Sequence, residues 1–180
     1  MPKRKPTRLK FFDYSNVGAY FVTICTTDRK QILSEIVRIG DVVNDKTPKL
    51  AVGEGLAPPE CRVKLKFCGE IAQEQLRSLK NKFPTVSVEN YVIMPDHIHA
   101  IIFLHDNAGG ASPSPTLSDV ICTFKSLTSR ICKERCGIEK MFQRSYAEHI
   151  IRDRRDFETR NKHIYENPMR RYYKKTFNDE

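Results

Sequence analysis

Two apolar segments joined by a Met-Pro-Asp junction constrain the fold more than any other part of this 180-residue sequence. Residues 85–94 read TVSVENYVIM and residues 96–105 read DHIHAIIFLH, and both are rich in β-branched and aromatic residues, which are enriched in strands. Proline fixes the backbone φ angle and aspartate favours turns, so the chain should reverse at Pro95. We therefore expect an antiparallel hairpin of two strands.

The second of these strands carries two histidines, His97 and His99. Successive side chains of a strand point to opposite faces, so both histidines share one face, about 7 Å apart. The residues between and beyond them should form the core face: Ile98, Ala100, Ile102 and Leu104. Two imidazoles on one strand can chelate a single cation, and Asp96 in the turn can orient one of them. The alternative is two surface histidines on a solvated sheet face.

The other expected elements follow from hydrophobic spacing and from helix-end signals. Two further strands are expected at 18–29 and 141–152. Three helices are expected: one at 70–83, one that begins after the capping residue Thr116 and ends near Gly137, and one at 153–167 that ends around Pro168. Residues 30–62 look irregular, with an exposed loop at 52–62, and 106–115 look like a flexible linker. The order β, α, β, β, α, β, α predicts an α/β ferredoxin-like fold, a split βαβ with an antiparallel sheet and an extra C-terminal helix.

Composition indicates one soluble domain spanning residues 1–180, because 39% of residues are hydrophobic and 29% are charged. No apolar run approaches the ~18 residues of a membrane helix, and no apolar segment follows the charged N-terminus as in a secretory signal. The six cysteines contain no CxxC pair, which favours reduced thiols in a cytoplasmic protein. Cys132 and Cys136 can be neighbours on a helix, which gives only a weak indication of metal binding.

The net charge of +9 is concentrated at the two ends of the chain. The N-terminal segment 1–10 has five basic residues and no acid: Lys3, Arg4, Lys5, Arg8 and Lys10. The C-terminal tail 169–180 carries Arg170, Arg171, Lys174 and Lys175 around two tyrosines, Tyr172 and Tyr173. Such patches attract phosphate backbones, and tyrosines can stack on unpaired bases. The same composition also suits two solvated tails.

Three segments together carry a resemblance to a known family. They are RLKFFDYSNVGAYFVTICTTDR at 8–29, YVIMPDHIHAIIFL at 91–104 and FQRSYAEHIIRDRRDFETRNKHIYENP at 142–168. In this order they resemble the REP-associated tyrosine transposases, a branch of the single-tyrosine HUH transposases of bacterial insertion sequences. HUH stands for His-hydrophobic-His, here His97-Ile98-His99.

The resemblance implies a ferredoxin-like domain that cleaves and rejoins single-stranded, hairpin-forming DNA. A tyrosine on the last helix would attack the DNA backbone and form a 5′-phosphotyrosine. Mg²⁺ or Mn²⁺ would be held by His97, His99 and a polar residue one helical turn beyond the tyrosine, here Asn167. Insertion-sequence relatives act as dimers and the REP-associated branch can act alone, so a monomer and a homodimer are both compatible with it.

The sequence departs from this family at the nucleophile. The family reads Tyr-x-x-x-Asn-Pro, whereas this chain has His163 four residues before Asn167-Pro168. His163 and Asn167 share a helix face, whereas Tyr165 lies about 200° away around an ideal helix. Tyr165 can serve if Pro168 distorts the last turn.

Two further interpretations remain open. The protein can be a DNA-hairpin-binding protein that has lost the tyrosine, with His163 as an extra metal ligand. Alternatively, His163 itself performs phosphoryl chemistry, as a nucleophile or by activating water, or a tyrosine comes from elsewhere, such as Tyr146 or Tyr172.

Basic residues also flank this region, and beside a phosphate-handling site we expect them to contact the DNA backbone. They are Arg152, Arg154, Arg155, Arg160 and Lys162, in addition to Arg170 and Arg171. His105 and His149 are read as structural residues rather than as ligands.

Overall fold

The computed structural model describes residues 17–38, 61–106 and 115–176. A four-stranded antiparallel sheet with the order β4-β5-β1-β6 forms its centre. These strands are β1 (Gly18–Cys25), β4 (Val86–Ile93), β5 (His97–Leu104) and β6 (Ala147–Ile151). The connection that contains the first long helix joins β1 to β4, with β5 between them in the sheet, and the connection that contains the second joins β5 to β6, with β1 between them. This topology confirms the predicted split βαβ, ferredoxin-like fold.

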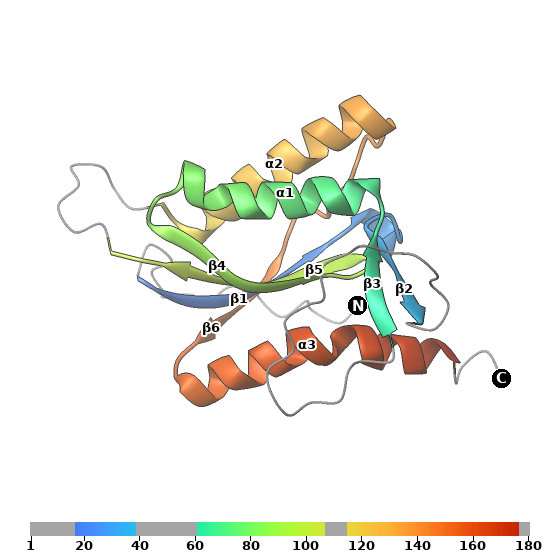
Figure 1. Ribbon diagram of the computed structural model, residues 1–180. Helices are drawn as coiled ribbons and strands as arrows, with labels where there is room; N and C mark the ends of the chain where they lie inside the picture. Colours follow the sequence, from blue (N-terminus) through green and yellow to red (C-terminus); the bar gives the residue numbers. More distant parts are fainter. Residues whose placement is uncertain (1–16, 39–60, 107–114, 177–180) are drawn as a thin grey trace, which may run out of the picture.

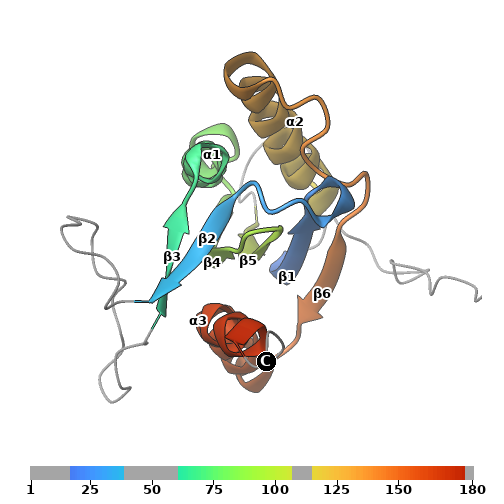
Figure 2. The same ribbon diagram turned by 90° about the vertical axis from the view of Figure 1, so that its right-hand side faces the viewer.

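Three helices cover the two faces of this sheet. Helices α1 (Phe67–Lys82) and α2 (Leu117–Cys136) lie on one face, and α3 (Arg154–Thr176) lies on the other (Figures 1 and 2). The predicted core face of β5 is confirmed, since Ile98, Ala100 and Ile102 are fully buried in the cluster beneath α1 and α2. A smaller cluster under α3 contains Phe21, Val92, Met94, Ile101 and Ile164.

The hairpin predicted from 85–94 and 96–105 is confirmed. Strand β4 pairs with β5 from Val86 opposite Leu104 to Ile93 opposite Ile98, with a bulge between Val88 and Asn90. Strand β1 pairs with the other edge of β5, which makes β5 an interior strand. The two histidines therefore stand at the start of an interior strand, where neighbouring strands restrict their motion.

The predicted limits of α2 are also confirmed. Thr116 and Asp119 form a reciprocal capping box, in which the Asp119 amide donates to Thr116 Oγ1 and Thr116 N–H donates to Asp119 Oδ2. Gly137 ends the helix at φ 68°, a left-handed conformation that glycine adopts without a Cβ clash.

The prediction that residues 30–62 are irregular is confirmed for 30–33 and wrong for 34–38 and 61–62. Strand β2 (Ser34–Arg38) pairs with β3 (Cys61–Leu65) in a separate two-stranded sheet beside α3. Ile36 and Val63 point their apolar side chains at the cluster under α3. The remaining predicted loop residues 52–60, the N-terminal segment 1–10 and most of the linker, 107–114, lie outside the described residues.

The last helix does not end at Pro168 as predicted. Helix α3 continues to Thr176, so the described part of the predicted basic tail, residues 169–176, is helical. Proline removes one backbone hydrogen bond, but Arg171 beyond it donates to Asp96 Oδ1 at 2.9 Å and Arg170 pairs with Glu166. These contacts hold the helix on both sides of the proline.

Strand β6 is shorter than the predicted 141–152, because Phe142 forms only an isolated bridge with Thr26. Across the described ranges, we find no helix long and apolar enough to cross a membrane.

Candidate functional site

The HUH histidines are buried between the sheet and α3. His97 and His99 are only 8% and 7% exposed, so the alternative of a solvated sheet face is excluded. Their cross-strand partners on β1 are Cys25 and Thr23. The pair lies on the face of β5 opposite the main core, as strand alternation predicted.

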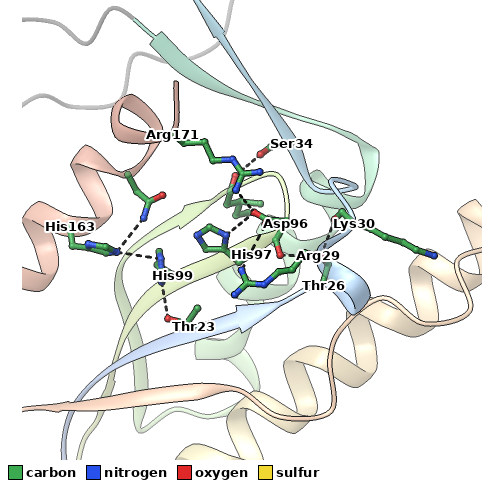
Figure 3. Close-up of polar contacts among 12 residues, drawn as sticks. Thr23, Thr26, Arg29, Lys30, Ser34, Asp96, His97, His99, His163 and Arg171 are labelled. Atoms are coloured by element: carbon green, nitrogen blue, oxygen red, sulfur yellow. Dashed lines mark hydrogen bonds and ion pairs between the residues drawn. The ribbon is translucent and has the colours of Figure 1, made fainter. Parts of the chain in front are cut away.

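Asp96 anchors the first histidine. His97 Nδ1 lies 2.8 Å from Asp96 Oδ1, and Arg171 NH1 from α3 donates to the same oxygen at 2.9 Å (Figure 3). Arg29 NH1 lies 3.8 Å from Asp96 Oδ2. The backbone of Asp96 is fixed as well, because its carbonyl accepts from the N–H and from the hydroxyl of Thr26, both at 3.0 Å. This arrangement fixes the orientation of the His97 ring.

The second histidine is held by β1 and contacted by α3. Thr23 Oγ1 lies 2.9 Å from His99 Nδ1, and the Phe21 ring stacks on His99 with centroids 5.0 Å apart. His163 Nε2 from α3 lies 3.4 Å from His99 Nε2 (Figure 3). Asn167 Nδ2 lies 3.2 Å from His163 Nε2. The structure therefore brings His163 and Asn167, four residues apart on one helix, to the HUH pair.

Burial keeps all three imidazoles neutral near pH 7. It lowers the pKa of His99 to about 3, with further lowering from the neighbouring His97 and His163. Burial also lowers the pKa of His97, against the opposing effect of Asp96. The pKa of His163 is lowered by burial and then by the charges of Arg170 and Arg160. Burial raises the pKa of Asp96, but its hydrogen bond and charge interaction with His97 and the charge of Arg171 outweigh burial, so that pKa is lowered overall.

The hydrogen-bond partners leave the Nε2 atoms available as ligands. When the Nδ1 atoms of His97 and His99 carry hydrogens, they donate to Asp96 and to Thr23, and each Nε2 keeps a free lone pair. His163 Nε2 differs, because its single lone pair is occupied when the Asn167 amide donates to it. His99 Nε2 lies 3.4 Å away, and two acceptor nitrogens at this distance repel unless a proton or a cation lies near them.

These donors fit a divalent cation, with a restriction on the ligand set. In the described ranges, no three His, Cys, Asp or Glu side chains form a group that could hold a metal ion. An ion at His97 and His99 would therefore need the Asn167 amide oxygen, water or substrate oxygens to complete its coordination. The two imidazoles suit Mn²⁺ better than Mg²⁺, which prefers oxygen ligands.

Tyr165 is separate from this contact network. Its hydroxyl oxygen is buried and has no hydrogen-bond partner among the described residues. Tyr146 OH lies 3.4 Å from Ser118 Oγ, and the rings of Tyr172 and Tyr173 contact each other. His163 is thus the side chain from the nucleophile region that contacts the HUH pair.

The predicted DNA-binding arginines occupy different places. Four of them are exposed: Arg152, Arg154, Arg155 and Arg170. Arg154 forms an ion pair with Glu158, and Arg170 forms one with Glu166. Arg171 instead turns inward to Asp96. Lys3, Arg4, Lys5 and Arg8 lie outside the described residues.

Sequence reasoning missed Arg29, Thr23 and Thr26. Asp28 and Arg29 have φ angles of 53° and 55°, an uncommon left-handed conformation for residues other than glycine. Such strain is typical of functional sites, and here the turn places the Arg29 guanidinium beside Asp96. The only available signal was the polar TTDR stretch directly after the first strand.

His149 has a structural role, in line with the sequence interpretation. Its Nε2 lies 2.7 Å from Asp156 Oδ2, and Arg160 bonds to the same carboxylate, so β6 is joined to the first turns of α3. The Arg160 guanidinium also lies 5.6 Å from the centroid of the Phe21 ring. His105 is exposed and its Nε2 lies 2.9 Å from Ser87 Oγ, away from the HUH pair.

No protein-family model matches the sequence. An uncharacterized protein of Haemophilus influenzae is 24% identical over 181 residues, which cover 92% of this chain and 88% of the relative. A solved structure of a REP-associated tyrosine transposase bound to a REP hairpin aligns with a TM-score of 0.55 and 17% identity, over 95% of this chain and 74% of that chain. This chain has the fold of that transposase. A Deinococcus radiodurans protein aligns less well, with a TM-score of 0.46 and 15% identity.

Proposed function

We propose that this protein is a divalent-metal-dependent transesterase for single-stranded, hairpin-forming DNA, in which His163 takes the place of the nucleophilic tyrosine. The observation that carries the proposal is the convergence of His163 and Asn167 on the buried HUH pair, with 3.4 Å between His163 Nε2 and His99 Nε2. The transposase with the same fold is bound to a REP hairpin, which supports DNA of that kind as the partner.

His97 and His99 would hold the cation, with Asn167 as the additional ligand and Mn²⁺ as the preferred ion. When bound, the ion would polarise the scissile phosphate and stabilise its developing negative charge. Asp96 serves to hold the His97 ring, and Thr23 serves to hold the His99 ring. Both rings are neutral at pH 7 because burial lowers their pKa values, so neither must lose a proton before it binds metal.

His163 has the properties that a nitrogen nucleophile needs. Its lowered pKa keeps the ring neutral. The Asn167 amide orients the ring through Nε2, and this hydrogen bond would have to break before the lone pair of Nε2 can attack. Nε2 would attack phosphorus, the bond from phosphorus to the 3′ oxygen would break, and that oxygen would take up a proton while the ring releases one from Nδ1. The product is a 5′-phosphohistidine with a free 3′ hydroxyl, and the reverse reaction rejoins the strand.

Positive charge around the site favours a polyanionic substrate. Arg29 and Arg171 share the single carboxylate of Asp96, which leaves an excess of positive charge beside the histidines. Arg29 is the more exposed of the two, with 55% of its side chain accessible against 33% for Arg171. We assign Arg29 to the DNA phosphates beside the histidines, and the exposed Arg152, Arg154 and Arg155 to phosphates further along the strand, because they lie around the start of α3, the end of the helix away from Arg171.

The test is a search for a covalent adduct. The protein is incubated with Mn²⁺ and a labelled hairpin oligonucleotide carrying a single-stranded extension, and then separated under denaturing conditions. We expect an adduct that survives alkali and is cleaved by acid, as a phosphohistidine is, and that is lost in His163→Ala but kept in Tyr165→Phe. An acid-stable adduct that disappears in Tyr165→Phe would transfer the role of nucleophile to Tyr165.

The second candidate is a hairpin-binding protein without strand cleavage. The observation that favours it is the buried, unpartnered hydroxyl of Tyr165, because no tyrosine is then available at the site for the usual reaction of the family. Tight hairpin binding with neither adduct nor nicking in Mn²⁺, for the wild type at several extension lengths, would select this function. The affinity should fall steeply with salt for either candidate.

A further inference from the structure

Three cysteines gather at one end of the layer formed by α1 and α2, on the sheet face opposite the HUH pair. Cys68 lies in the first turn of α1, and Cys132 and Cys136 lie one turn apart at the end of α2. Cys68 Sγ is 3.6 Å from Cys136 Sγ, although the two residues are 68 positions apart in the sequence. This contact is independent of the proposed DNA chemistry.

The three thiols differ in their access to solvent. Cys136 is exposed, whereas Cys68 and Cys132 are buried at 5% and 0% exposure. Burial raises the pKa of the Cys68 thiol, and its hydrogen bond with Cys136 raises it further. Burial also raises the pKa of Cys132. An oxidant from solvent therefore meets Cys136 first, with Cys68 directly behind it.

A metal ion is the other common occupant of a cysteine cluster. The described residues, these three thiols included, contain no group of three or more His, Cys, Asp or Glu side chains that could hold one. All six cysteines are free thiols in the structure. A contact between two thiols, one accessible and one buried, suits reversible oxidation.

We propose that Cys136 and Cys68 form a peroxide-sensitive oxidation site that closes to an intramolecular disulfide. The Cys136 thiolate attacks one oxygen of hydrogen peroxide, the O–O bond breaks, and Cys136 becomes a sulfenic acid while hydroxide leaves. The Cys68 sulfur then attacks the Cys136 sulfur, which forms the S–S bond and expels the second oxygen as water with the Cys68 proton. Two thiols and one peroxide thus give one disulfide and two waters, and a dithiol reverses the reaction.

The disulfide would join the start of α1 to the end of α2. The start of α1 is already fixed to the rest of the molecule, since Lys66 N–H donates to Leu33 O at 2.9 Å and Gly69 packs against the same carbonyl. The new bond would close a long loop onto this fixed helix start, and it should raise the melting temperature.

Peptide mapping tests the site directly. The full-length protein is treated with hydrogen peroxide, the remaining thiols are blocked, and trypsin then places the three cysteines on separate peptides: Phe67–Arg77, Ile131–Lys133 and Cys136–Lys140. We expect a cross-link between the first and the last of these peptides, a loss of two titratable thiols, and a rise in melting temperature that dithiothreitol reverses. Cys136→Ser should abolish all three effects.

Cys122→Ser is the matched control, because Cys122 is also an exposed cysteine of α2 and its removal should leave the cross-link unchanged. A link between Cys132 and Cys136, dimers joined through Cys136, or sulfinic acid at Cys136 without any cross-link would each overturn the proposal. None of these readouts depends on DNA cleavage, so the failure of the proposed function would leave this test intact.

Discussion

His163 Nε2 lies 3.4 Å from His99 Nε2, so the residue four positions before Asn167 contacts the HUH pair directly. The Asn167 amide holds His163 from the next turn of α3 at 3.2 Å. A helix places i and i+4 side chains together, so a side chain at position 163 faces the same site whatever its chemistry. Under the proposed function, this relationship would let a single substitution at position 163 exchange the nucleophile.

His163→Tyr restores the Tyr-x-x-x-Asn-Pro pattern of the family. We expect the hairpin adduct to change from acid-labile to acid-stable, because a phosphotyrosine would replace the phosphohistidine. The measurement is the survival of labelled adduct in acid, compared with the wild type. Tyr165→Phe in the His163→Tyr background is the control and should leave the adduct acid-stable. An adduct that remains acid-labile in His163→Tyr would mean that residue 163 does not carry the phosphoryl group.

Asp96→Asn should weaken metal binding. The carboxylate fixes the His97 ring and balances Arg171, and loss of such a partner typically costs about 10–100-fold in metal affinity. The expected result is a Mn²⁺ dissociation constant raised by at least about 10-fold, measured by titration calorimetry or by the electron paramagnetic resonance of free Mn²⁺. The control is Asp106→Asn, since Asp106 is exposed at the end of β5. Equal affinity in both variants would argue against His97 as a ligand.

Much of this site could be predicted, because its residues follow regular periods. Strand alternation placed His97 and His99 on one face, and helix periodicity placed His163 with Asn167. The burial of the histidines could not be predicted, since it depends on α3 crossing the opposite face of the sheet. Arg171 was predicted to contact DNA from a basic tail beyond the helix, because Pro168 signals a helix end, whereas contacts of Arg171 and Arg170 hold the helix beyond that proline.

The β2–β3 hairpin was missed although its sequence carries a weak signal. Arg62, Val63, Lys64 and Leu65 alternate polar and apolar residues in the manner of a strand. The segment between the two strands, residues 39–60, is long and rich in glycine and proline, and its sequence lacks the Asn-Gly or Asp-Gly pair that signals a tight hairpin turn. The role of Arg29 was not predicted for a different reason. Its side chain is placed by the positive φ angles of Asp28 and Arg29, and the sequence gives no signal for these angles.

Stability should fall in acid because the histidines are buried in the neutral form. The pKa of His99 is about 3 in the folded protein and about 6.5 in an unfolded chain. Between these values the unfolded state binds more protons, so the contribution of His99 is fully present above about pH 6.5 and is lost as pH falls towards 3. His97 and His163, with lowered pKa values, act in the same direction.

Urea denaturation at a series of pH values between 7 and 4, carried out with a metal chelator, measures this dependence. His99→Gln should reduce the slope of the unfolding free energy against pH, because one acid-sensitive group is removed. His105→Gln, at an exposed histidine, should retain the wild-type slope. The same slope in all three proteins would show that His99 takes up its proton without unfolding.

Gly69→Ala should destabilise the fold and the site together. A Cβ at Gly69 would lie 2.0 Å from the backbone oxygen of Leu33, so one of the two backbones must move. Overpacking of this kind costs about 1–3 kcal/mol. Leu33 N–H also donates to Pro95 O in the turn that precedes His97, so the movement should lower Mn²⁺ affinity as well.

Gly137→Ala provides the comparison, since nothing lies within 4 Å of a Cβ there and only the left-handed φ of 68° opposes the change. We expect a loss of about 1 kcal/mol in unfolding free energy and no change in Mn²⁺ affinity, because Gly137 follows α2 on the other side of the sheet. Urea denaturation of both variants measures the unfolding free energy, and Mn²⁺ titration measures the metal affinity. If Gly69→Ala lost stability but kept wild-type Mn²⁺ affinity, the turn before His97 would be independent of the packing between α1 and Leu33.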